Sequence, residues 1–270
     1  MTRKKVSIGR LVLWGISLTV LFYLCCHVFV IIPISFSSSE YLEFPPKGFS
    51  LKWYRNYFSS PGWTTPTILS MQLATVVMVI STIIGTLAAL GATRRKFPGK
   101  TIFQILMLSP MIIPIIIISI AIYNYLAKMH LIGNFWGMVI GHLIVAVPFV
   151  FINVSATFQG FDITLEKASY SLGANRLKTF FLVTFPLIRP GIFTGALFAF
   201  IISFDELIIT MFVAGIRYTL PVRMWQDLRL EINPTIATIS TFFIILSIAA
   251  LLSAEWIRRR AEKRYHYPAA

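Results

Sequence analysis

Long apolar stretches dominate this chain and constrain its fold more than any other feature. Of its 270 residues, 57% are hydrophobic and 13% are charged, whereas a soluble domain carries roughly 25% charged residues. A helix needs about 20 predominantly apolar residues to cross a bilayer. We predict an all-α integral membrane bundle in which residues 1–270 form a single transmembrane domain. Six stretches are long enough to span, and these are 11–36, 66–93, 101–127, 131–158, 190–216 and 233–254.

Basic residues are distributed unevenly between the segments that join these spans. With the N-terminus placed in the cytoplasm, most of the 24 Lys and Arg residues fall in cytoplasmic segments, as the positive-inside rule requires. We therefore expect both termini to be cytoplasmic. The net charge of +14 follows from this topology and does not indicate a nucleic-acid partner. The first span has a longer apolar run than the roughly 7–15 residues of a secretion-signal core, and we interpret it as a membrane anchor.

No pattern typical of covalent catalysis or metal binding occurs in the chain. The segment FPGKT at 97–101 resembles the end of a phosphate-binding loop, but Arg94 occupies the place of its first glycine. The adjacent Cys25 and Cys26 do not have the spacing of metal ligands. We predict that the protein is not an enzyme and has neither catalytic residues nor a metal site.

The segment between the fourth and fifth predicted spans, residues 159–189, is amphipathic and basic. Across 165–178, apolar residues alternate with polar ones at roughly helical spacing, so one face can lie on the bundle while the other projects into the cytoplasm. Gly173 provides a permissive turn between two short helices, and Pro186 and Pro190 mark the return to the membrane. These features fit docking to a cytoplasmic partner and binding to anionic lipid equally well.

Two acidic residues, Asp205 and Glu206, lie in the middle of the fifth predicted span. A charge at the membrane centre costs on the order of 3 kcal/mol and by default marks a pathway. Adjacent helix positions point about 100° apart, so we expect one carboxylate to face a cavity and the other to pair with a neighbouring helix. We assign both to a substrate pathway for a cationic cargo, with a structural hydrogen-bonded pair as the alternative. His142, in the fourth span, is expected to be hydrogen-bonded within the bundle.

The loop at 159–189 also carries a family motif. Lys167-Ala168-Ser169, Gly173 and Val183-x-Phe185-Pro186 resemble the EAA loop of permease subunits of ATP-driven importers, which reads E-A-A, three residues, G, nine residues, I-x-L-P. Lys167 stands at the usual glutamate position, and Glu166 lies one place earlier. In that family the loop forms a coupling helix that sits in a cleft of the ATPase subunit. The resemblance therefore implies a set of residues that couple to the ATPase: Glu166, Lys167, Ala168, Ser169, Gly173, Ala174, Arg176, Lys178 and Pro186.

This resemblance extends over nearly the whole chain. Four segments look like the second permease of spermidine/putrescine-type importers, within the binding-protein-dependent, MetI-like ABC importers. They are residues 44–54, Gly160-Phe161-Asp162, Ser203-Phe204-Asp205-Glu206 and Thr219-Leu220-Pro221. The implied fold is a type I ABC importer permease bundle in the bacterial inner membrane.

Several partners follow from the resemblance. They are a homodimer of ATP-binding subunits, a second homologous permease, a periplasmic solute-binding protein and membrane lipid. No cofactor is expected in this chain, because ATP and Mg²⁺ bind to the ATPase. The implied cargo is a polyamine (putrescine or spermidine) or a related amine, although related importers carry opines, aminophosphonates, amino acid derivatives or ferric ion. The alternative function is an ion-coupled secondary carrier or a channel with Asp205 and Glu206 as its ion site.

Overall fold

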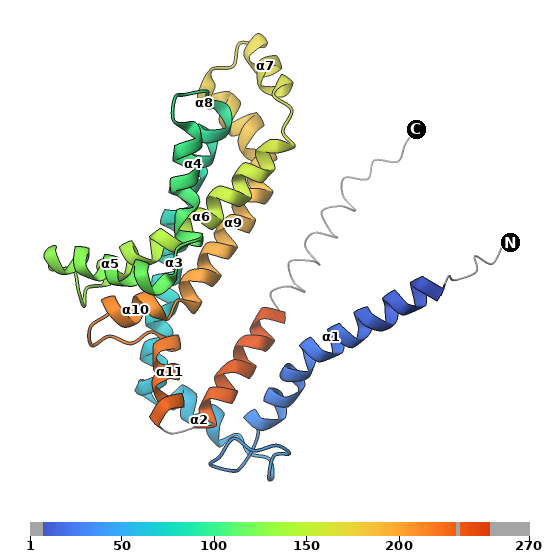
Figure 1. Ribbon diagram of the computed structural model, residues 1–270, viewed down its shortest axis with the longest axis vertical. Helices are drawn as coiled ribbons and strands as arrows, with labels where there is room; N and C mark the ends of the chain where they lie inside the picture. Colours follow the sequence, from blue (N-terminus) through green and yellow to red (C-terminus); the bar gives the residue numbers. More distant parts are fainter. Residues whose placement is uncertain (1–7, 231–232, 249–270) are drawn as a thin grey trace. The chain divides into compact units, whose positions relative to one another are not determined.

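The computed structural model describes residues 8–230 and 233–248, and the regular elements among them are all helices. The chain divides into two compact units, one built from its two ends (up to Thr64 and from Gln226) and one from Thr65–Trp225. Figure 1 shows the helices in the order in which the chain forms them. They are α1 (Ile8–Ser35), α2 (Lys52–Ser59), α3 (Pro61–Arg94), α4 (Lys100–Leu108), α5 (Ile115–Lys128), α6 (Phe135–Gln159), α7 (Thr164–Ser171), α8 (Arg176–Thr179), α9 (Phe185–Asp205), α10 (Ile208–Val213) and α11 (Leu220–Leu230).

Four helices in the described part of the chain are long and apolar enough to cross a membrane. They are Val12–Ser35, Pro61–Arg94, Phe135–Gln159 and Arg176–Asp205. The shorter apolar helix Thr235–Ile248 covers most of the sixth predicted span, whose last residues, 249–254, lie outside the described ones. Except for Arg10, the basic residues near both termini also lie outside them.

The third predicted span is not straight. The segment Lys100–Met111 and helix α5 meet at an angle of 101°, and Figure 1 shows α5 turning away from the direction of α4. Pro110 lies in a 3-10 turn, Ser109–Met111, and Pro114 has extended backbone (ψ 128°) directly before α5. Proline cannot donate the backbone hydrogen bond that continues a helix, and here the helix breaks and changes direction by 101°.

The fifth predicted span begins earlier than expected and ends sooner. A single helical run extends over Arg176–Asp205, with a π-helical turn η2, Phe180–Thr184, between α8 and α9. Pro186 and Pro190 therefore lie within this helical run and not at its start. Pro186 lies in the first turn of α9, where proline is tolerated, and Pro190 lies inside the helix.

Helices α6 and α9 pack side by side and form the centre of the larger unit (Figure 1). Two glycines of α9 make the close approach possible: a Cβ on Gly191 would overlap Thr157, and one on Gly195 would lie 3.0 Å from the Cα of Val150. Small residues at such crossings allow helix backbones to pack closely within a membrane.

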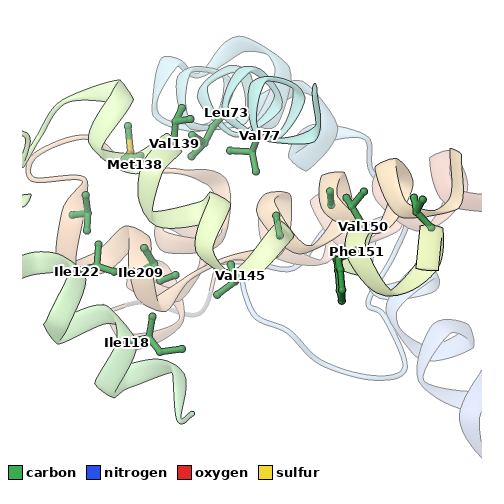
Figure 2. Close-up of a cluster of buried hydrophobic side chains, with 14 of the residues drawn as sticks. Leu73, Val77, Ile118, Ile122, Met138, Val139, Val145, Val150, Phe151 and Ile209 are labelled. Carbon is green, nitrogen blue, oxygen red and sulfur yellow. The ribbon is translucent and has the colours of Figure 1, made fainter. Parts of the chain in front are cut away.

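The buried core of this unit collects apolar side chains from several helices. Figure 2 shows Leu73 and Val77 of α3 beside Val139 of α6. Ile118 of α5 and Ile209 of α10 lie in the same cluster. The core therefore holds the bent α5 and the short α10 against the long helices.

The smaller unit joins the end of α1 to α2 and to helix Thr235–Ile248. Asn56 of α2 donates to the hydroxyl of Thr235 at 3.0 Å, and the Thr238 hydroxyl donates to the carbonyl of Ser35 at 3.3 Å. Tyr57 is 3% exposed and lies near Phe242, with 6.2 Å between ring centroids. Tyr57 is therefore a buried packing residue of this unit.

Candidate functional site

The loop after α6 folds as two short helices joined at Gly173, as its sequence predicts. Gly173 has φ +84°, a left-handed conformation that favours glycine over residues with a Cβ. The Asn175 side chain accepts from the amide of Lys178 at 2.9 Å and caps the start of α8. These local signals fix the turn between α7 and α8.

Asp162 fixes the start of α7. Its carboxylate accepts from the Thr164 amide at 2.9 Å and from the Thr164 hydroxyl at 2.6 Å. These two hydrogen bonds lower the pKa of Asp162 below its usual value, which keeps it ionised at neutral pH. The first turn of α7 therefore has a fixed negative charge at its N-terminal end, where a helix favours one.

The outer surface of the loop is basic and apolar. Leu172 is 89% exposed and Leu177 is 70% exposed, which is unusual for residues that could pack on a bundle. Most of the predicted coupling residues share this exposure: Lys167, Ala168, Gly173, Arg176, Lys178 and Pro186. This arrangement offers a partner both charge and apolar contact area.

Three of the predicted coupling residues face the bundle or the loop itself. Glu166 accepts from Arg94 at 2.8 Å and from the Thr184 hydroxyl at 2.6 Å. Ser169 shares a hydrogen bond of 3.0 Å with the buried Thr179. The amide of Ala174 donates to the Ser169 carbonyl at 3.1 Å. The charge of Glu166 is thus paired inside the protein. Glu166 therefore does not supply on the outer surface the glutamate that the family motif has at position 167.

Arg94 and Thr184 were missed by the sequence reading. Arg94 directly follows the second predicted span, 66–93, and its charge was interpreted only as part of the topological signal. Thr184 lies among apolar residues in the predicted re-entry. The available signal in the sequence was that Glu166 lies one place before the motif position, which Lys167 occupies. That displacement suggested a partner for its carboxylate other than the docking surface.

Asp205 and Glu206 lie at a break in the helix. Helix α9 ends at Asp205, Glu206 is extended (φ −70°, ψ 111°), and α10 begins at Ile208. The expectation of two side chains about 100° apart on one continuous helix was therefore wrong. One oxygen of Glu206 accepts from the amide of Ile209 at 2.9 Å, whereas Asp205 is exposed. Neither carboxylate has an ion-pair partner within the described ranges.

His142 connects three helices next to this break. The side chain is completely buried. Its Nδ1 lies 2.9 Å from the Ser203 hydroxyl of α9, and its Nε2 lies 2.9 Å from the Thr210 hydroxyl of α10. Because Thr210 donates its own proton to the Glu206 carbonyl at 3.0 Å, it must accept from His142. The neutral imidazole therefore carries its proton on Nε2, and the Ser203 hydroxyl donates to Nδ1. This confirms the expectation that His142 is hydrogen-bonded within the bundle.

The coupling residues and the acidic pair lie at opposite ends of α9. That helix has 21 residues, which corresponds to a length of roughly 30 Å. Any effect of the loop on the acidic pair must therefore travel along packed helices.

Comparison with known proteins assigns the chain to a family. Residues 81–267 match the family described as "Binding-protein-dependent transport system inner membrane component", which is more than half of the chain. The chain belongs to this family. It is accordingly an ABC importer permease, a membrane component of a transport system, and the expected ABC permease fold is confirmed.

Curated relatives cover most of the permease. It is 26% identical over 239 residues to the spermidine/putrescine transport system permease protein PotC of Haemophilus influenzae, covering 88% of this chain and 93% of that one. It is 30% identical over 254 residues to the putrescine transport system permease protein PotI of Escherichia coli K12, covering 90% and 89%. The molybdenum transport system permease protein ModB of Haemophilus influenzae is 28% identical over 214 residues, covering 73% and 93%.

A solved structure has the same fold. A bacterial ABC transporter involved in the import of the acidic polysaccharide alginate aligns with a TM-score of 0.63 at 16% identity, covering 98% of this permease and 100% of that chain. Together with the described helices, this match supports an all-α bundle of the ABC importer permease type.

Proposed function

We propose that this chain is the transmembrane permease subunit of an ATP-driven, binding-protein-dependent importer of a polyamine (putrescine or spermidine) or a related amine. The observation that carries the cargo assignment is the acidic pair at the break between α9 and α10. Two carboxylates at the end of the apolar helical run Arg176–Asp205, those of Asp205 and Glu206, have no cationic partner within the described part of the chain. Such residues mark a transport pathway by default.

A diffusing diamine complements this site. Two opposite charges about 4 Å apart attract by about 4 kcal/mol at an effective dielectric constant near 20, and desolvation offsets much of that attraction. The remainder suits a cargo that must bind and leave quickly. The relatives PotC and PotI are named for putrescine or spermidine, whereas ModB is named for molybdenum. Family membership alone does not select the cargo, and the charge of the site favours an amine.

The loop between α6 and α9 supplies the contact with the motor. We assign its exposed face, with Lys167, Arg176, Lys178 and Leu177, to docking on a homodimer of ATP-binding subunits. A second homologous permease completes the pathway, a periplasmic solute-binding protein delivers cargo, and both chain termini face the cytoplasm. Transport then proceeds by rigid-body rocking of the bundle about a fixed site.

Uptake by the complete transporter tests the cargo. We expect the reconstituted complex with ATP to take up labelled putrescine and spermidine in preference to aminobutyrate, which has no net charge. Asp205→Asn or Glu206→Gln is expected to raise the half-saturating putrescine concentration by about tenfold, equivalent to ~1.4 kcal/mol. Asp205→Glu is the matched control, because it preserves the charge.

Two results would contradict this assignment. Equal putrescine uptake by the Asp205→Asn and Glu206→Gln variants and the wild type would remove the acidic pair from the pathway. Uphill transport on an ion gradient by the chain alone, without nucleotide, would favour the ion-coupled carrier instead.

A further inference from the structure

Helix α7 is held to the rest of the larger unit by polar contacts on one face of the helix. None of its residues is buried, and its larger apolar side chains, Leu165 and Tyr170, are 46% and 45% exposed. Its contacts with buried groups come from Glu166 and Ser169, which are three residues apart and therefore lie on the same side of the helix. Directional polar bonds, more than apolar packing, thus set the position of α7.

One carboxylate oxygen of Glu166 joins three segments of the chain. It accepts from Nη2 of Arg94 at 2.8 Å and from the hydroxyl of Thr184 at 2.6 Å. Arg94 is the last residue of α3, and Thr184 is the last residue of the π-helical turn before α9. Thr184 is only 2% exposed, so this anchor lies on the bundle side of the loop.

The environment of Arg94 strengthens the ion pair. Its guanidinium carbon lies 4.2 Å from the ring centre of Phe161 and 5.0 Å from that of Phe158. The exposed fractions of the Arg94 and Glu166 side chains are 17% and 14%. A shielded, hydrogen-bonded pair of this kind is stronger than an exposed surface ion pair.

This ion pair connects α7 to a helix that the chain does not connect to it. The polypeptide links α7 only to α6 and, through α8, to α9. The Arg94–Glu166 contact adds α3, which contributes Leu73 and Val77 to the buried core. Without it, a displacement of α7 reaches α3 only through the packing of other helices.

We propose that Arg94 and Glu166 form a latch that transmits movement of the coupling loop to α3, which makes Arg94 a positioning residue for transport. This inference rests on the proposed function, because it assumes that an ATPase moves α7. In this assignment Glu166 acts within the permease, and docking is left to the exposed basic residues.

Two measurements on matched variants test the latch. Arg94→Gln and Glu166→Gln break it, while Arg95→Gln removes the same charge from the adjacent residue, which is exposed and forms no ion pair in the described part of the chain. The first measurement is cargo transported per ATP hydrolysed by the reconstituted complex. We expect a fall of about tenfold for Arg94→Gln, the factor that one charge-assisted hydrogen bond supplies, with unchanged recovery of the ATPase. Arg95→Gln is expected to match the wild type.

Glu166→Gln is expected to lower the cargo transported per ATP at least as much as Arg94→Gln does, because it leaves a shielded guanidinium without its carboxylate. The double variant Arg94→Gln/Glu166→Gln should be no worse than Glu166→Gln alone, since both act on one contact. Additive losses, or a transport ratio for Arg94→Gln equal to that of Arg95→Gln, would overturn the latch. If Arg94→Gln does not accumulate, Glu166→Gln alone is compared with Arg95→Gln.

Amide hydrogen exchange in the permease alone forms the second measurement and needs neither ATPase nor cargo. The latch predicts that exchange across α7 quickens about tenfold in Arg94→Gln and stays at the wild-type rate in Arg95→Gln. Unchanged exchange in both variants would overturn the latch even if transport falls. Absence of amine uptake by the wild-type complex, with faster α7 exchange in Arg94→Gln, would reject the proposed cargo and leave the latch standing.

Discussion

Replacing His142 with alanine tests how the break between α9 and α10 is stabilised. His142 is completely buried, and its two ring nitrogens bond to Ser203 of α9 and Thr210 of α10. The alanine variant removes both bonds and leaves a space the size of an imidazole between three helices. Because Thr210 also donates to the carbonyl of Glu206, the same variant loosens the segment that carries the acidic pair.

The expected cost can be divided between two terms. The hydroxyl of Ser203, 3% exposed, loses its partner, and a buried hydroxyl left unpaired costs about 1–3 kcal/mol. Thr210 keeps its bond to Glu206 and adds little. The cavity adds about 2–4 kcal/mol by analogy with the truncation of other large buried side chains. Together these terms lower the free energy of unfolding by roughly 3–7 kcal/mol, or a Tm by on the order of 10–20 °C in a unit of this size.

Thermal unfolding of the purified permease in detergent measures this loss, and a second variant separates its terms. His142→Leu/Ser203→Ala removes donor and acceptor together and fills most of the space, so we expect it to recover most of the lost Tm. If His142→Ala lowers the Tm by less than about 2 °C, the buried hydrogen bonds do not stabilise the break. A double variant as unstable as His142→Ala would show that the shape of the imidazole, and not its hydrogen bonding, matters.

Two further predictions concern the packing of α9 and the start of α7. Gly191→Leu places a side chain where a Cβ would already overlap Thr157, so we expect α6 and α9 to separate and the Tm to fall by an amount typical of about 1–3 kcal/mol of overpacking; a Tm equal to the wild type would mean that these helices do not meet closely there. The bonds from Thr164 lower the pKa of Asp162 below its ordinary 3.8, so their stabilisation of α7 is complete above that value and is lost as the pH falls through the lower, folded value. Asp162 is therefore expected to stay ionised between pH 6 and 8, so its titration should not change amide exchange at Thr164 in that interval. Asp162→Asn should quicken this exchange at pH 7. A change in Thr164 exchange between pH 6 and 8 that is caused by titration of Asp162 would contradict the assignment.

Apolar length was enough to locate four of the predicted membrane helices, because a spanning segment has to satisfy its backbone groups internally whatever surrounds it. The direction of each helix was harder to predict from the sequence. Pro110 and Pro114 lie at the interruption of the third predicted span, but a 101° change of direction depends on how Ile118 and the rest of α5 pack on the core. Proline shows where a helix can bend, and tertiary packing decides by how much.

The break at Glu206 could not be read from local sequence. No glycine or proline lies between Ser203 and Thr210, and the apolar pattern continues through the segment. The interruption is compensated by contacts from elsewhere, since Glu206 accepts from Ile209 and His142 bonds across the gap to α9 and α10. His142 lies 61 residues from Ser203 in sequence, beyond the range of any periodicity argument.

The coupling loop shows the same division between local and distant information. The turn at Gly173 followed from the residue type alone, because few other residues adopt φ +84° readily. The orientation of Glu166 did not, because its partner Arg94 lies 72 residues away. A loop position next to a family motif indicated importance, and only the folded contacts distinguish an outward docking charge from an inward ion pair.

Helix α9 connects the Glu166 contact at one end with the His142 contact at the other. At its start, Thr184 is bonded to Glu166 of α7, and near its end Ser203 is bonded to His142 of α6. Between these two contacts, Gly191 and Gly195 allow α9 to pack directly against α6. Close-packed helices of this kind resist sliding, because each side chain occupies a space shaped by the other helix. We therefore expect α6 and α9 to move together, so that a displacement of α7 at one end reaches the Asp205–Glu206 break at the other with little loss along the way.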